Sequence, residues 1–177
     1  PILSYISGRA DANDGAEDEP RCVYTELGKR VMAIWQTVPA YHPGVKIIAA
    51  EAMPDHFHGL LHLSNTCKQH LGRIVNGFMI GCTHEYWDML GINWRSMKKD
   101  INKSARAAAR EWQDHDRTRS FRGPALFVRG YNDVEAITIE LVETKRRYIR
   151  EQARRALIKG SMPDCFRIHR NCNSHGW

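Results

Sequence analysis

The sequence predicts an α+β fold, because segments of helical and of strand periodicity follow one another along the chain. Apolar residues recur at helical spacing in three segments, at about residues 25–38, 64–90 and 134–159. Two shorter apolar-rich runs of strand character, at residues 45–53 and 56–63, lie between the first and second of these. With 177 residues, 42% of them hydrophobic, the chain can bury one full core, and we expect a single domain.

The N-terminal part is expected to form a short strand, a loop and a helix. Ile2 to Ile6 is the candidate strand, and residues 8–21 are polar and rich in Gly, Asp and Glu, as in a loop. Thr25 is a candidate N-cap for the helix, which should end before Pro39 or Pro43. The apolar face of this helix consists of Leu27, Val31, Ile34 and Val38.

The two strand-like runs at residues 45–53 and 56–63 come next, and a second helix follows them. Ser64 or Thr66 is its candidate N-cap, and it should extend to about Leu90. Its apolar face consists of Leu71, Ile74, Val75, Phe78 and Met79. We expect both helices to cover one side of the sheet, the side of Phe57.

The remaining segments are a basic connection, a strand, a helix and a tail. Residues 91–123 form the basic connecting insertion, part of it helical around residues 105–112. A strand near residues 125–128 should complete the sheet. Helical character then extends from about Val134 to Lys159, and residues 160–177 form a C-terminal tail.

Residues 54–61 contain two histidines separated by one large apolar residue. Side chains alternate faces along a strand, so His56 and His58 should share one face while Phe57 points into the core. Two imidazoles roughly 6 to 7 Å apart along a strand can close on one divalent cation. The plainer alternative is that these are ordinary surface or core histidines, since the chain has nine.

A second chemical cluster lies far along the chain, in the last helical segment. Tyr148 and Gln152 are four residues apart and should share one helical face, with several arginines close by. A phenol, an amide oxygen that can bind a metal, and nearby positive charge suit phosphodiester cleavage by a tyrosine nucleophile. Tyr131 is a competing nucleophile candidate, but it lies in a predicted turn.

Three blocks of the sequence resemble a known family. Residues 53–58 read Met-Pro-Asp-His-Phe-His, residues 126–133 read Leu-Phe-Val-Arg-Gly-Tyr-Asn-Asp, and residues 147–155 read Arg-Tyr-Ile-Arg-Glu-Gln-Ala-Arg-Arg. Together they resemble the single-tyrosine HUH transposases, and among these most closely the REP-associated tyrosine transposases. The resemblance covers most of residues 23–166.

The resemblance implies a fold and an activity. The fold would be a ferredoxin-like antiparallel sheet, with helices on one face and a tyrosine-bearing helix over the other. His56, His58 and Gln152 would bind Mg²⁺ or Mn²⁺, and Tyr148 would be the nucleophile. The protein would then be a transposase that nicks and transfers single-stranded or hairpin DNA through a 5′-phosphotyrosine intermediate, as a monomer or homodimer.

The distribution of charge fits a nucleic-acid partner. The formal net charge is +6, and residues 145–170 hold nine Lys or Arg against two Asp or Glu. Residues 95–122 hold nine against four. A solvated helix face is the common alternative for such a run. The candidate DNA contacts are Arg146, Arg147, Arg150, Arg154, Arg155, Lys98 and Lys99.

Two other functions stay open. One is a domesticated or truncated relative that binds hairpin DNA without cutting it, and the other is a metal-dependent hydrolase that activates water. Its five cysteines show no Cys-x-x-Cys spacing, which favours a reducing compartment. There is no apolar run of eighteen residues and no signal-peptide pattern, so we expect a cytoplasmic protein without a membrane span.

Overall fold

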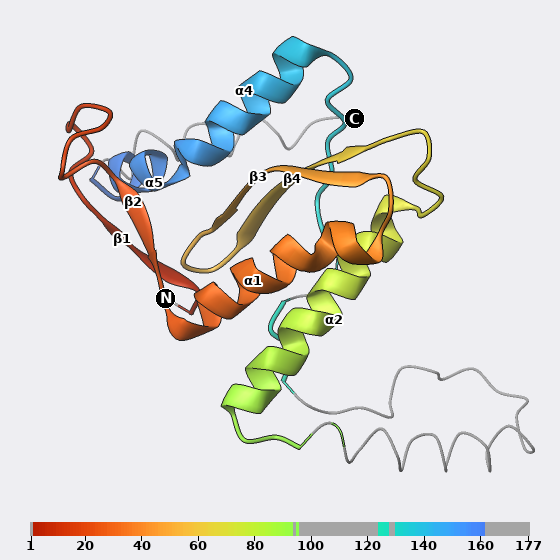
Figure 1. Cartoon of the computed structure of the whole chain (residues 1–177). Helices are drawn as coiled ribbons and strands as arrows, with labels where there is room; N and C mark the ends of the chain where they lie inside the picture. The colour runs from red at the N-terminus through yellow and green to blue at the C-terminus, as the bar shows by residue number, and fades with distance from the viewer. Residues whose placement is uncertain (1, 94, 96–123, 128–129, 162–177) are drawn as a thin grey trace, which may run out of the picture. The chain divides into compact units, whose positions relative to one another are not determined.

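The computed structural model describes residues 2–93, 95, 124–127 and 130–161, and it confirms the α+β class (Figure 1). The chain falls into two compact units, one formed by residues 1–68 with 132–177 and the other by residues 69–131. In chain order the elements are β1 (Ser4–Ser7), β2 (Arg21–Tyr24), α1 (Glu26–Tyr41), β3 (Val45–Ala52), β4 (Phe57–Leu63), α2 (Leu71–Met89), α4 (Ile139–Arg150) and α5 (Gln152–Ser161).

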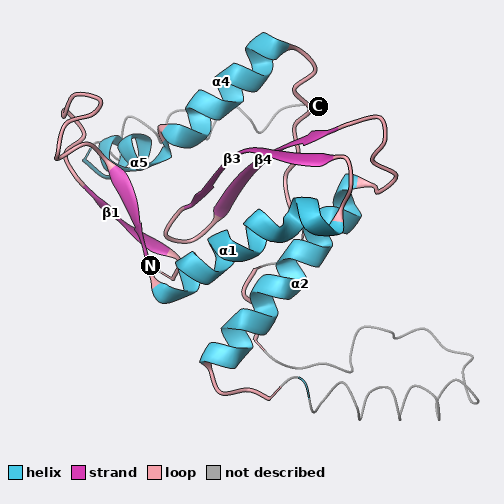
Figure 2. Cartoon of the chain, in the orientation of Figure 1, coloured by secondary structure: helices cyan, strands magenta, loops and turns pink. Residues whose placement is uncertain are grey.

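The described strands form two separate antiparallel pairs, β1 with β2 and β3 with β4, and not the single sheet that we expected (Figure 2). The two pairs contact each other through side chains and through residues that flank the strands. The Tyr24 hydroxyl donates to Glu51 at 2.6 Å, and Ile2 N–H, before β1, donates to Pro54 O, after β3, at 2.9 Å. Residues 124–127 are not a strand, so the predicted strand at 125–128 is not formed there.

Helix α1 begins where the sequence predicts and ends later than the first of the two predicted ends. The Thr25 hydroxyl accepts a hydrogen bond from Gly28 N–H at 3.1 Å, which makes it the N-cap. The helix continues through Pro39 to Tyr41. A proline near a helix end removes only one backbone donor, and His42 N–H still binds Val38 O at 3.1 Å to close the last turn.

Helix α1 packs on the β3–β4 hairpin on the side of Phe57, as predicted. The buried residues of the helix include Val31, Trp35 and Val38. The ring of Trp35 lies edge-on to Phe57, with 5.0 Å between centroids. Gly59 lies on the same face, and a Cβ there would come within 2.5 Å of the Trp35 ring. The indole therefore requires a glycine beneath it.

Replacing Phe57 with aspartate is expected to destabilise the protein by about 3 kcal/mol, because a charge would replace the ring that packs on Trp35. The measurement is the free energy of unfolding in urea. Phe57→Leu is the matched control, since it keeps an apolar side chain and should cost about 1 kcal/mol. Equal stability of the aspartate variant and the wild type would mean that Phe57 does not face the core.

Helix α2 begins later than the sequence predicts. His70 is its N-cap and accepts from Gly72 N–H at 3.1 Å, whereas Ser64 and Thr66 bind each other at 2.7 Å in the preceding turn. The hydroxyls are therefore used in a local turn, which competes with capping. Ile74 and Phe78 are buried, in agreement with the predicted apolar face.

The segment predicted to be helical from about residue 134 to 159 begins later, at Ile139, and consists of two helices. Thr138 caps α4, with its hydroxyl accepting from Leu141 N–H at 3.2 Å, and Glu151 separates α4 from α5. Helix α4 packs on β3 and β4, whereas α5 packs on β1 and β2. Among the residues that the structure describes, no helix is long and apolar enough to cross a membrane.

Candidate metal and tyrosine site

The β3–β4 turn places the two histidines. Met53 N–H binds His56 O at 2.9 Å, which closes the turn, and the strand β4 then starts at Phe57. His58 pairs with Glu51 across the hairpin, so the two side chains share a face. Strand alternation puts this face opposite Phe57 and hence opposite α1. Helix α4, which packs on the hairpin, lies on the histidine side.

The two imidazoles converge on each other through their Nε2 atoms, which are 3.0 Å apart. Bonds of about 2.1 Å to one ion place two ligand atoms about 3.0–3.4 Å apart. The Nδ1 atom of His56 is 2.6 Å from Asp55 Oδ1, and this hydrogen bond lowers the pKa of Asp55. If Nδ1 donates to the carboxylate, the lone pair of His56 is on Nε2, which is the atom that faces His58.

The surroundings of His58 favour its neutral form. Burial lowers its pKa and the neighbouring His56 lowers it further, while a hydrogen bond with Gln152 raises it. The two lowering effects prevail. A metal ion binds only the neutral imidazole. A lowered pKa therefore makes the lone pair of His58 more available to a metal ion at neutral pH than that of a solvated histidine.

Tyr148 and Gln152 meet the histidine pair from the helical side. The rings of Tyr148 and His58 lie edge-on, with 5.8 Å between centroids. Gln152 is only 8% exposed, and its Nε2 donates to the Tyr148 carbonyl oxygen at 3.0 Å. Gln152 also forms a side-chain hydrogen bond with His58, which raises the pKa of that histidine. Tyr148 on α4 and Gln152 on α5 therefore both lie next to His58, although Glu151 separates the two helices.

These residues suit Mg²⁺ or Mn²⁺ as a donor set. Two imidazole nitrogens and one amide oxygen are available, a mixture that Mn²⁺ accepts more readily than Mg²⁺ does. Within the described part of the chain, no group of three or more His, Cys, Asp or Glu residues could hold a metal. The third ligand that the family resemblance implies is the amide of Gln152, a residue type outside this set.

Positive charge lies next to the tyrosine. The guanidinium of Arg155 is 5.0 Å from the centre of the Tyr148 ring, and it also lies 3.6 Å from Glu151. Arg147 and Arg150 are exposed on α4. Arg146 is exposed too and is 3.6 Å from Glu143.

Arg154 differs from the other predicted DNA contacts on α4 and α5. Its guanidinium binds the loop between β1 and β2, and its side chain is 24% exposed. Lys98 and Lys99 lie outside the described residues.

Three residues beside the site were not singled out for a role from the sequence. Asp55 orients His56, and its position directly before the histidine was the available signal. Glu51 is the one acidic residue in the apolar run 45–53, and it binds the Tyr24 hydroxyl at 2.6 Å. Burial, and to a smaller extent the charge of Glu51, raise the pKa of Cys22 to about 11. This thiol is therefore a poor nucleophile at neutral pH.

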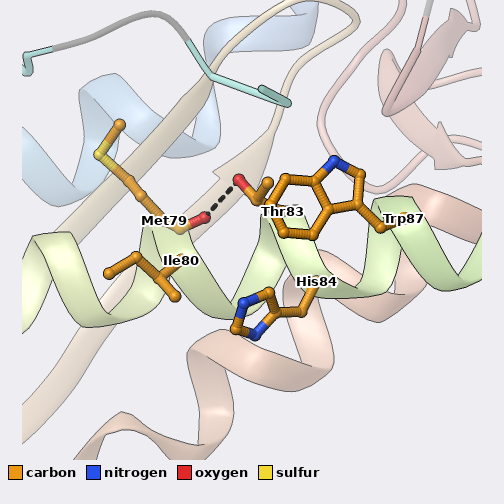
Figure 3. A pocket seen from close by; sticks show the side chains of 5 residues that line it. All are labelled: Met79, Ile80, Thr83, His84 and Trp87. Carbon is orange, nitrogen blue, oxygen red and sulfur yellow. Dashed lines mark hydrogen bonds between the residues drawn. The ribbon is translucent and has the colours of Figure 1, made fainter. Parts of the chain in front are cut away.

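Helix α2, in the other unit, carries a pocket of about 140 Å³ (Figure 3). It is lined by Met79, Ile80, Thr83, His84 and Trp87. The Thr83 hydroxyl already donates to Met79 O at 2.8 Å, as the figure shows. His84 is the one ionisable side chain in the lining. The lining therefore contains no second ionisable side chain that could act together with His84, and we assign the pocket no catalytic role.

Comparisons of the chain with models of protein families, with curated proteins and with solved structures gave no match.

Proposed function

We propose that this protein is a metal-dependent nickase and strand transferase of single-stranded DNA, a transposase that uses Tyr148 as its nucleophile. The observation that carries the proposal is the meeting of four residues from distant parts of the chain. The Nε2 atoms of His56 and His58 lie 3.0 Å apart, and the Tyr148 ring lies 5.8 Å from that of His58. Gln152 is buried and forms hydrogen bonds with Tyr148 O and with His58. This set is the one that a single-tyrosine HUH transposase would require.

The proposal includes a ferredoxin-like arrangement of the strands. The β1–β2 and β3–β4 pairs lie in the same compact unit, and main-chain hydrogen bonds join Ile2 and Leu3 to Pro54. Helix α1 covers one face of the β3–β4 hairpin, and α4 covers the other. We propose that the two pairs are parts of one ferredoxin-like sheet.

The chemistry divides among the residues as follows. A Mg²⁺ or Mn²⁺ ion held by His56, His58 and Gln152 would polarise the scissile phosphate. The phenol oxygen of Tyr148 attacks phosphorus and loses its proton. The bond from phosphorus to the 3′-oxygen breaks, and that oxygen takes up a proton to leave a 3′-hydroxyl.

The product of this step is a 5′-phosphotyrosine, in which a phosphodiester replaces a phosphodiester. Attack by another 3′-hydroxyl therefore rejoins DNA without an external energy source. The guanidinium of Arg155 over the Tyr148 ring supplies positive charge where the phenolate forms.

Incubation of the wild-type protein with labelled single-stranded and hairpin oligonucleotides and Mn²⁺ tests the proposal. On a denaturing gel we expect cleaved DNA together with a covalent 5′-linked protein species, and neither in the presence of EDTA. Cleavage without a covalent species would identify a hydrolase that uses water. Binding without cleavage would identify a non-catalytic DNA-binding protein.

The affinity for single-stranded DNA is expected to fall steeply with salt, by roughly 0.7 log units per tenfold salt for each phosphate contacted. Arg147 and Arg150 are exposed on α4, so replacing both with alanine should reduce the slope by about 1.4. Fluorescence anisotropy at several salt concentrations measures it.

The matched control for this slope is the pair Lys29→Ala and Arg30→Ala. It removes the same charge from α1, on the opposite face of the β3–β4 hairpin. We expect the control to retain the wild-type slope. If both double variants had the same slope, α4 would not lie along the DNA.

A further inference from the structure

Arg154 joins α5 to a loop that is about 140 residues away in the sequence. Its Nη1 donates to the carbonyl oxygens of Ala10 at 2.8 Å and Ala12 at 2.6 Å. Its Nη2 binds Asp14 Oδ1 at 2.7 Å. Two of the three acceptors are backbone carbonyl oxygens, so the contact depends on the conformation of the loop as well as on the charge of Asp14.

The loop that Arg154 binds, residues 8–20, has its own internal structure. Arg9 N–H donates to Asp18 O at 2.8 Å, and the Arg9 side chain pairs with Asp11 and Asp18. At its entry Gly8 has a φ of +109°, and a Cβ there would lie 2.6 Å from Glu19 O. The two ends of the loop therefore close tightly on each other. A loop with this many internal contacts can act as a fixed anchor for α5.

Helix α5 needs such an anchor because it is not continuous with α4. Glu151 separates the two helices, and α5 begins at Gln152. A break between helices leaves the direction of the second helix to be set by its tertiary contacts. Arg154 is two residues beyond Gln152, on the same first turn of α5. Its contacts therefore attach the loop to the same turn that carries Gln152.

We propose that Arg154 is a positioning residue, which holds the first turn of α5 against the β1–β2 loop and so keeps the Gln152 amide beside His58. The inference deepens the proposed function and rests on it, because it gives Arg154 a role in the same metal site. The planar fork of arginine can serve all three acceptors at once, whereas a lysine ammonium on the same stem cannot match that geometry. Arg154 contacts neither DNA nor metal in this role.

The test compares full-length variants by Mn²⁺ binding, measured from the electron paramagnetic resonance signal of free Mn²⁺. Substitution of a residue that supports a metal ligand typically lowers metal affinity by about 10 to 100-fold. We therefore expect Arg154→Ala to weaken Mn²⁺ binding by about 10-fold. Arg154→Lys and Asp14→Asn should have smaller effects in the same direction. Arg30→Ala removes an arginine from α1 and should bind Mn²⁺ like the wild type. If Arg154→Ala does not fold, Arg154→Lys and Asp14→Asn provide the test.

Hydrogen exchange provides a second measurement that needs no metal. In Arg154→Ala, the amides of the first turns of α5 should exchange faster while those of α1 keep their rates. A merely structural role would lower the melting temperature but leave Mn²⁺ affinity unchanged well below it. Wild-type Mn²⁺ affinity of Arg154→Ala would overturn the inference, whether or not exchange in α5 became faster.

The remaining outcomes separate this inference from the proposed function. If Arg154→Ala kept its Mn²⁺ affinity but flattened the salt dependence of DNA binding, Arg154 would be a DNA contact and the inference would be wrong. If the wild type bound no Mn²⁺, the proposed metal site itself would be wrong, whatever Arg154 does. If the wild type bound Mn²⁺ and all the Arg154 variants did so equally, only the positioning role would be lost.

Discussion

Replacing Tyr148 with phenylalanine is expected to abolish cleavage and to leave DNA binding unchanged. The substitution keeps the ring that packs edge-on to His58 and under Arg155, and it removes only the phenol oxygen. Without that oxygen no 5′-phosphotyrosine can form. The measurements are the affinity for a hairpin oligonucleotide, and the yields of cleaved strand and covalent species on denaturing gels with Mn²⁺.

Tyr131→Phe is the matched control for this experiment. Tyr131 is also partly exposed, at 43% against 41% for Tyr148, but it belongs to the other compact unit. The control should cut DNA at the wild-type rate. Mass spectrometry of the wild-type protein after reaction should place the nucleotide remnant on the tryptic peptide that contains Tyr148. A remnant on the peptide with Tyr131 would mean that Tyr131 is the nucleophile.

The outcome for Tyr148→Phe also separates the three candidate functions. A hydrolase that activates water would still cut DNA after the substitution. A protein that only binds DNA would show no cleavage even as the wild type. The transposase alone loses both cleavage and the covalent species while keeping its affinity.

Local patterns predicted the parts of the fold that depend on neighbouring residues. The Thr25 cap and the Phe57 contact with α1 follow from spacing along the chain. The strands predicted at residues 45–53 and 56–63 also form, as β3 and β4, each one residue shorter than predicted. Strand alternation also predicted that His56 and His58 share a face, and their Nε2 atoms do converge, although His56 lies in the turn one residue before β4.

The features that the sequence did not predict depend on distant contacts. Strand β2 is only four residues long and follows an acidic loop, so its periodicity is too short to read. The break at Glu151 interrupts a segment of continuous helical character, because α4 and α5 pack on different strand pairs. Arg154 looked like one more residue in a basic run, and only the folded chain brings it to Asp14.

Removal of either histidine is expected to abolish Mn²⁺ binding and cleavage while the protein stays folded. The two Nε2 atoms converge at 3.0 Å, so each provides half of the nitrogen donors of the proposed site. Even outer-shell partners change metal affinity by about 10 to 100-fold, and loss of a ligand should therefore exceed about 100-fold. Both side chains point away from α1, so His56→Ala and His58→Ala should unfold at nearly the wild-type urea concentration.

His62→Ala is the matched control for the two histidine variants. His62 lies four residues beyond His58 on β4, on the same face by strand alternation, and it is exposed. We expect this variant to bind Mn²⁺ and to cut DNA like the wild type. If His56→Ala and His58→Ala kept their metal-dependent cleavage, the histidine pair would not be the metal site. If His62→Ala lost activity as well, the effect would reflect the strand as a whole and not the two converging nitrogens.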